Sequence, residues 1–327
     1  MKKIALFVTL LLLPLALLAE EKATQSGQKT FPIETGASIY VSNDEGNIEV
    51  NSWDKSEVQI AWEKIAFGKS KEAAEKILKE TEIDIFHSVH TLRVKIIEPR
   101  REKKFSFWDI FDPDTWANFP RSPVVHFRLF VPRNADLNLS ADEGNISVKN
   151  CSGSLTITVD EGKINCENIV GEDIKLVSDE GRITGTNIQA PDGKIFIRTD
   201  EGKIHLENAA CDRATIKCDE GKIYCSEFYA RRATMTTDEG NIEVFLANKD
   251  GDSYRFYTDE GNVTLHFPDA FSCKFDLKTQ EGRIRDDFGL KISKFDGGQR
   301  CRESIGTEPA RQITVSVSEG NIYLRKK

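Results

Sequence analysis

The chain has 327 residues, of which 39% are hydrophobic and 30% charged, and its formal net charge is −8. This length can bury a large core, in one continuous body or in two domains. The acidic balance disfavours binding to the phosphates of nucleic acids, so we expect no nucleic-acid partner.

The N-terminus has the organisation of a secretory signal peptide. Two lysines precede an uninterrupted apolar run at residues 4–18, and Ala19 is followed by two glutamates. The run is shorter than the ~20 residues that a membrane-spanning helix needs. The sequence therefore predicts a cleaved signal peptide at residues 1–19 and an exported protein, located in the periplasm, on the cell surface or in the medium. Leu17, where a small residue is more usual, leaves a retained N-terminal anchor as the alternative. We expect no integral membrane span after cleavage.

The next hundred residues lack a repeat. Residues 20–30 are expected to form a flexible segment, and residues 31–131 to form strands with one helix. The helix is predicted at residues 69–80, where KSKEAAEKILKE places apolar residues at helical spacing among good helix formers. The strands are expected at 83–86, 91–97 and 124–131.

An aromatic insertion at residues 100–123 interrupts this part of the chain. It contains more aromatic side chains than a solvated loop normally shows. It is either a lid over the open first coil or a projecting contact loop for a partner. The candidate contact residues are Phe105, Phe107, Trp108, Phe111, Trp116 and Phe119.

One phrase recurs along the chain: Asp-Glu-Gly, then Asn, Lys or Arg, then Ile. Its glycines, including two relaxed copies, are Gly46, Gly144, Gly162, Gly181, Gly202, Gly221, Gly240, Gly261, Gly282 and Gly320. From Gly144 to Gly282 the steps are 18 to 21 residues, and the final interval of 38 reads as two steps of 19. A fixed period near 20 predicts a solenoid.

The residues around each glycine predict strand, turn and strand. Apolar side chains stand seven, five and three positions before it, and two and four after it. This period-two alternation is typical of strands, and Asp followed by Gly suits the turn because glycine accepts a positive φ. Six positions after the glycine, four copies carry an asparagine suited to a second bend or a stacked amide ladder: Asn150, Asn168, Asn187 and Asn208. Each coil is therefore expected to contain two strands and two turns.

The predicted fold is all-β: a single-stranded parallel β-helix, or solenoid, of about ten coils of 18–21 residues, with one short helix in the N-terminal part. The repeats proper occupy residues 132–327. A right-handed winding is favoured by the general preference of parallel crossovers, with left-handed solenoids as the exception. The basic tail at residues 325–327 is expected to protect the exposed strand edge of the last coil.

The stacked turn carboxylates are the first candidate for a metal site, since calcium prefers clustered oxygen ligands. They are Asp160, Asp179, Asp200, Asp219, Asp238 and Asp259. The sequence lacks the G-G-x-G-x-D-x spacing of calcium-binding solenoids, which favours a structural role and no cofactor. A basic column is expected to offset the repulsion between these acids: Lys163, Arg182, Lys203, Lys222 and Arg283.

Reactive side chains do not form a recognisable catalytic motif. The seven cysteines lack paired zinc spacing, and most are expected to fill the interior as small apolar residues rather than to form disulfides. Five histidines are scattered, and no G-x-S-x-G, H-E-x-x-H or glycine-rich phosphate motif occurs. The sequence thus predicts a protein that is not an enzyme.

The chain resembles the bacterial putative-adhesin domain family over about residues 31–324. The matching features are SNDEGNIEV, KEAAEKIL, VHFRLFVP, the serial DEG[NKR]I turns and ITVSVSEGNIYL. The resemblance implies a β-helix without an assigned reaction. We therefore expect an exported scaffold that presents its surface to a protein or glycan of the cell envelope. A carbohydrate-binding or carbohydrate-active β-helix enzyme, and an envelope sensor that binds a membrane protein, are the alternatives.

Overall fold

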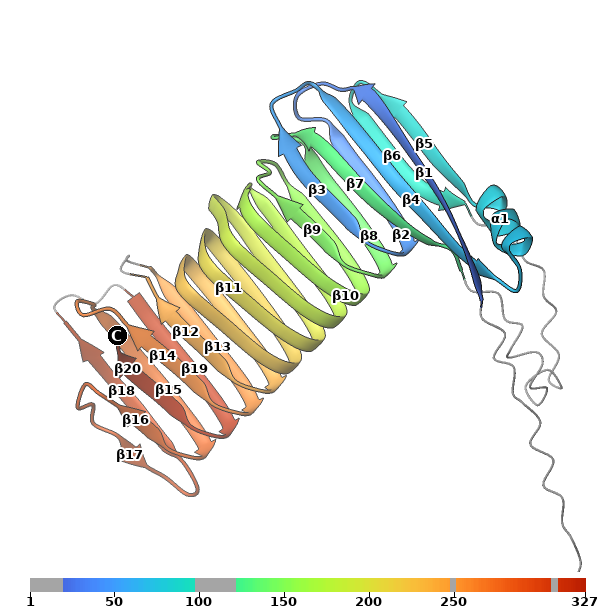
Figure 1. The fold of residues 1–327 in the computed structure, drawn as a ribbon. Helices are drawn as coiled ribbons and strands as arrows, with labels where there is room; N and C mark the ends of the chain where they lie inside the picture. Colours follow the sequence, from blue (N-terminus) through green and yellow to red (C-terminus); the bar gives the residue numbers. More distant parts are fainter. Residues whose placement is uncertain (1–19, 98–121, 248–250, 307–310) are drawn as a thin grey trace, which may run out of the picture.

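A computed structural model of the chain describes residues 20–97, 122–247, 251–306 and 311–327. The chain folds into a rod of stacked β coils, broadened at the N-terminal end by extra strands and one helix (Figure 1). The predicted signal peptide and the six aromatic candidate contact residues lie outside the described residues.

Two faces of the rod carry most strands. Each coil runs along face A, turns at the Asp-Glu-Gly corner and returns along face B. The strands of face A are β2 (Ser38–Glu45), β5 (Glu82–Ser88), β6 (Thr91–Ile97), β8 (Asp136–Glu143), β13 (Ser253–Glu260), β15 (Cys273–Glu281), β17 (Ser293–Lys294), β18 (Gln299–Ile305) and β19 (Arg311–Glu319). Those of face B are β1 (Glu21–Pro32), β3 (Ile48–Trp53), β4 (Glu57–Gly68), β7 (Val124–Pro132), β9 (Ile146–Lys149), β12 (Ile242–Leu246), β14 (Val263–Phe267), β16 (Ile284–Asp286) and β20 (Ile322–Lys326). The long strands β10 (Leu155–Val170) and β11 (Asp173–Glu239) wind through both faces.

The corner glycines form one line along the rod. A Cβ on any of nine of them would lie within 2.1 Å of the carbonyl oxygen of the adjacent corner glycine, so only glycine fits this stack. The spatial order is Gly46, Gly144, Gly162, Gly181, Gly202, Gly221, Gly240, Gly261, Gly320 and Gly282. The predicted solenoid of about ten coils is confirmed, but two of its rungs are out of sequence order.

At the N-terminal end, the first coil in sequence is the second in space. The β2 strand pairs in parallel with β6 on one side and with β8 on the other. The outer coil is formed by β6 and β7, which are joined through the aromatic insertion. Ser42 pairs with Lys95 and Ile48 with Phe127, so β6 and β7 continue the two faces on the outer side of β2 and β3.

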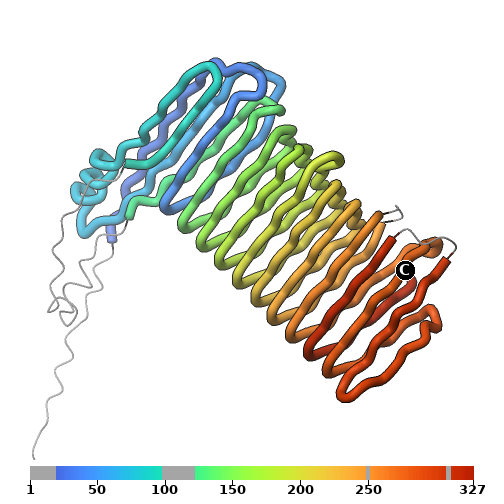
Figure 2. The backbone as a smooth tube through the Cα atoms, turned by 180° about the vertical axis from the view of Figure 1, so that it is seen from behind, coloured from blue at the N-terminus to red at the C-terminus, as the bar shows by residue number. Residues whose placement is uncertain are grey.

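At the C-terminal end, the last coil in sequence is inserted between two earlier ones. The β19 strand pairs with β13 and β15, and β20 pairs with β14 and β16, as the position of the red coil in Figure 2 shows. The prediction of two 19-residue steps is wrong, because β18 turns back antiparallel to β15 before the chain enters the gap. The basic tail therefore does not protect an outer edge, because β20 is paired on both sides.

The interior columns are as predicted, but each middle coil has a third side. Residues on both sides of the glycine alternate between buried and outward positions, as in Ile204 and Leu206. A further short segment follows, in which Ile169 pairs with Ile188. The predicted coil of two strands and two turns is thus incomplete, since a second bend before this segment creates a third buried row.

The second bend uses residues with a left-handed backbone. They are Asn150, Asn168, Asn187, Asn208 and Glu227, with φ between 47° and 60°. Asparagine tolerates this conformation better than other side chains with a Cβ. The four asparagines also form the expected amide ladder, with Nδ2 to Oδ1 distances of 2.9 to 3.0 Å between successive coils. Both interpretations of this column are confirmed.

The N-terminal strands and helix complete face B. The segment 20–30 was expected to be flexible, but residues 21–30 belong to β1, which pairs antiparallel with β4 over its whole length. Helix α1 (Lys71–Glu80) confirms the predicted helix, and Ser70 Oγ accepts a hydrogen bond from Ala73 N at its start. Lys64 Nζ donates to Leu78 O and Thr81 O at 2.8 and 2.9 Å. The buried ammonium, whose pKa is lowered by burial, thereby caps the helix and fastens it to β4.

All seven cysteines are free and buried, which confirms their role as interior residues. Burial raises the pKa of Cys151, Cys211 and Cys273 to about 12. Because the thiolate is the nucleophilic form, these side chains are inert in the folded protein.

Candidate binding surface on face B

Three hollows lie in line on the outer side of face B. The first, of about 500 Å³, lies over β1, β4, β7 and β3; the second and third, of about 390 and 520 Å³, lie over β10 and β11. Asn47 in the first hollow accepts a hydrogen bond from Asn145 in the second, and the second and third share Arg182 and Lys203. We call the surface of face B that carries these three hollows the face-B trough.

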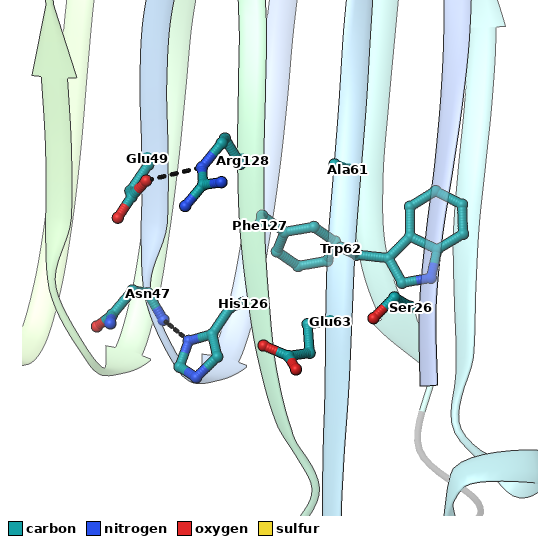
Figure 3. A pocket seen from close by; sticks show the side chains of 9 residues that line it. All are labelled: Ser26, Asn47, Glu49, Ala61, Trp62, Glu63, His126, Phe127 and Arg128. Carbon is teal, nitrogen blue, oxygen red and sulfur yellow. Dashed lines mark hydrogen bonds and ion pairs between the residues drawn. The ribbon is translucent and has the colours of Figure 1, made fainter. Parts of the chain in front are cut away.

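The first hollow combines a charged rim with aromatic edges (Figure 3). Arg128 Nε donates to Glu49 Oε2 at 3.0 Å, and Asn47 N donates to His126 Nδ1 at 3.1 Å. The proton of a neutral His126 ring is therefore on Nε2, which is left to donate to a ligand. The Trp62 indole lies against its partner in β1, Gly27. A Cβ at Gly27 would lie 2.4 Å from the indole, so only glycine leaves room for the ring there.

The third hollow arises from a step in side-chain size between adjacent rungs. Thr184 is small, whereas His205 and Tyr224, in the same column on the following rungs, are large. The His205 and Tyr224 rings stack with centroids 4.8 Å apart. Further along face B, Phe245 and His266 stack at 3.8 Å. The trough thus borders a row of aromatic side chains.

The residue after each corner glycine, which we call the +1 column, forms one edge of the trough. In spatial order it is Asn47, Asn145, Lys163, Arg182, Lys203, Lys222, Asn241, Asn262, Asn321 and Arg283. The asparagines are linked by amide ladders: the Nδ2 to Oδ1 distance is 3.1 Å from Asn145 to Asn47, from Asn262 to Asn241 and from Asn321 to Asn262. The ladder is interrupted at four consecutive rungs, Lys163, Arg182, Lys203 and Lys222, which we call the basic row.

The basic row carries largely unpaired charge. Lys163, Arg182 and Lys203 are exposed and form no ion pair within the described part of the chain. Lys222 donates to Glu243 Oε2 at 2.7 Å, and this contact with the ammonium, together with His266, lowers the Glu243 pKa against the opposing effect of burial. Rungs are about 4.8 Å apart, so the four cations repel each other along the stack.

Within the described ranges the basic column forms no direct ion pair with the turn acids, so the expected offset of their repulsion stays a prediction. Arg283 is separated from the basic row by three asparagine rungs, and the exposed members of the row contact no carboxylate within ion-pair distance among the described residues. Arg198 on face A instead bridges Asp200 and Asp219, at 2.8 and 3.4 Å. Within the described ranges, no three His, Cys, Asp or Glu residues are grouped so that they could hold a metal ion, and the six aspartates of the calcium hypothesis stay dispersed along the corners.

The histidines contact backbone atoms or glutamates. His87 contacts Pro32 O, His90 contacts Glu34, and His126 contacts Asn47 N. His205 contacts Glu207, and His266 contacts Glu243. None of these five contacts involves a serine or cysteine side chain, so they form no Ser-His or Cys-His pair of the kind used in nucleophilic catalysis.

Sequence reasoning identified the basic column but missed the trough. The glycine periodicity, which can be read from the sequence, places four basic residues on consecutive rungs: Lys163, Arg182, Lys203 and Lys222. The step at Thr184 and the hollow at Ala61 depend on the size of neighbours on adjacent rungs, and for Ala61 those neighbours are distant in sequence.

A family model described as Toastrack DUF4097 matches residues 101–325. Similar solved structures include a putative adhesin from Bacteroides fragilis, with 11% identity, 92% of this chain and 97% of that chain covered, and a TM-score of 0.38. A putative lipid binding protein from Parabacteroides distasonis has 14% identity, coverage of 92% and 96%, and a TM-score of 0.34. No curated protein matches the chain. Within the described ranges, no helix has the length and apolar character needed to cross a bilayer. Because the family model covers more than half of the sequence, this chain belongs to the Toastrack DUF4097 family.

Proposed function

We propose that the protein is an exported, non-enzymatic binding scaffold that holds an extended polymer of the cell envelope along the face-B trough. The observation that carries this proposal is that three open hollows lie over one face, two of them adjoining through Arg182 and Lys203. A small substrate would be held in a single enclosed pocket, whereas several open hollows along one face of a rod fit a long chain. The lysines and apolar run that open the sequence support export.

The described residues support a carbohydrate-active enzyme less well. The two carboxylates at the first hollow are Glu49, which is paired with Arg128, and Glu63 on the other side of β7. The five histidines contact backbone atoms or glutamates instead of a serine or cysteine side chain, and the cysteine thiols are buried. The rigid ladder of backbone pairs favours display of fixed groups over the closure that many catalytic sites need.

The scaffold role is tested by filling the trough. Thr184→Trp should place an indole in the third hollow and weaken retention of a bound polymer by roughly tenfold, or about 1.4 kcal/mol. The matched control is Thr215→Trp, which fills a separate hollow of about 330 Å³ on face A. The measurement is co-sedimentation or affinity retention with purified peptidoglycan sacculi, polygalacturonate and neutral laminarin.

We expect at least one polymer to be retained by the wild type and the face-A control, to be retained roughly tenfold more weakly by the trough variant, and to be recovered at its original length. Failure of every polymer to bind, or equal retention by both variants, would contradict a scaffold acting through this face. A shortened polymer would indicate an enzyme instead.

A further inference from the structure

The +1 column holds two kinds of residue, asparagines that extend a hydrogen-bonded ladder and basic residues that do not. Where the residue is asparagine, its Oδ1 accepts a hydrogen bond from the backbone N–H of the next rung, as Asn47 does from Asn145 at 3.0 Å. Lysine and arginine have no acceptor atom, so the basic row forgoes this bond. Four consecutive rungs therefore lose a ladder that the fold can readily build. The hydrogen-bonding of the ladder does not explain that choice.

The charges of the basic row are available to a ligand. Three of its members are exposed and have no ion-pair partner among the described residues, and they line the second and third hollows. Repulsion between adjacent cations is relieved when anions bind beside them. A ligand that follows the row should therefore carry negative charges at repeated intervals along its length.

The surroundings of the row suit a sugar chain. Thr184 supplies a hydroxyl, His205 an imidazole and Tyr224 a phenol along the third hollow. Rings provide apolar surface for the C–H faces of a sugar, while their polar atoms can bond its hydroxyl groups. The acidic corners disfavour a polymer as densely charged as a nucleic acid, since Glu180 lines the second hollow beside the basic row.

We propose that the basic row and the adjoining ring column bind an acidic polysaccharide, with the carboxylates of its uronic acid units placed against Lys163, Arg182, Lys203 and Lys222. This assignment rests on the proposed scaffold function and names the ligand class of the same trough. The polymer lies along the rod axis and crosses successive rungs. Sugar rings contact the His205 and Tyr224 column.

The test uses a ladder-restoring variant in which the basic row is replaced by the residue that the column already accepts: Lys163→Asn, Arg182→Asn, Lys203→Asn and Lys222→Asn. The matched control removes the same number of exposed positive charges from face A: Lys175→Gln, Lys194→Gln, Arg213→Gln and Lys217→Gln. The asparagine variant and the face-A control therefore have the same net charge and differ in where the charges were removed. Circular dichroism and the melting temperature verify folding, and we expect the asparagine variant to melt no lower than the wild type, since its ladder is continuous.

Binding is measured by titration with polygalacturonate and with its fully methyl-esterified form, which has the same backbone without charge. We expect the wild type and the face-A control to bind polygalacturonate, and the asparagine variant to bind it on the order of tenfold to a hundredfold more weakly. The methyl ester should bind the wild type about as weakly as polygalacturonate binds the asparagine variant. The uronate affinity of the wild type should fall with added salt.

The proposal is overturned if the asparagine variant keeps the wild-type affinity, if the face-A control loses as much, or if a single-stranded oligothymidylate binds more tightly than polygalacturonate. Binding of the neutral ester with undiminished affinity, still blocked by Thr184→Trp, would overturn the acidic ligand while leaving the scaffold function intact. Absence of any polymer binding would overturn both.

Discussion

Replacing Gly202 with alanine should destabilise the protein by about 4 kcal/mol or more, a loss beyond that of most single substitutions. The new Cβ would lie 1.7 Å from the carbonyl oxygen of Gly181, and the residue has a φ of +148°. The obstructing atom belongs to the backbone of the next rung and cannot rotate away. The two rungs would have to separate, which breaks ladder hydrogen bonds and opens the core on both faces.

Gly36→Ala is the matched control for this substitution. Gly36 also has a positive φ, of +76°, but no heavy atom lies within 4 Å of the position that a Cβ would occupy there. We expect it to cost about 1 kcal/mol, from the backbone conformation alone. Urea unfolding followed by circular dichroism compares the two. Similar midpoints for both variants would show that the corner glycines are not packed against each other as described.

Deleting residues 307–327 should release a larger part of the rod than the coil that is removed. The β19 and β20 strands lie between β13–β14 and β15–β16, so their loss leaves the outer strands without a partner. We expect residues 273–305 to exchange amide hydrogens as an unfolded segment, while the coils of β10 and β11 stay protected. Hydrogen exchange with mass spectrometry measures this directly.

The control for the deletion is a replacement of the exposed residues 293–296, which include β17, by a short glycine-serine linker. This segment is at the physical end of face A, and its loss should affect protection only locally. If the deletion of residues 307–327 leaves residues 273–305 protected, the last coil in sequence is the outermost coil after all, and the inserted topology is wrong.

The glycine pattern predicts which residues share a rung but not the order of the rungs. Each rung presents the same strand-turn-strand pattern to its neighbours, so β19 can pair with β13 as well as β15 can. The sequence indicates the irregular order only by an absence: no Asp-Glu-Gly phrase occurs midway between Gly282 and Gly320, where a regular coil would have its corner. The swap at the N-terminus was hidden in the same way by the long interval after Gly46.

Local chemistry was easier to predict than the binding surface. The turn asparagines, the helix start at Ser70 and the buried cysteines each depend on residues close in sequence or on burial alone. The trough depends on relative side-chain size across rungs, as at Ala61 between Arg128 and the β1 strand. The third side of the middle coils was missed because it contributes only one or two buried residues to each coil.

A titration with galacturonate oligomers of increasing length tests the binding account most directly. The four rungs of the basic row span about 14 Å, so affinity should rise with each added sugar until the chain covers them and should then level off. That result would show a ladder of similar subsites along the rod. If the monomer binds as tightly as the long chains, the ligand is held at a single point, and the account of face B as a track for a polymer is contradicted.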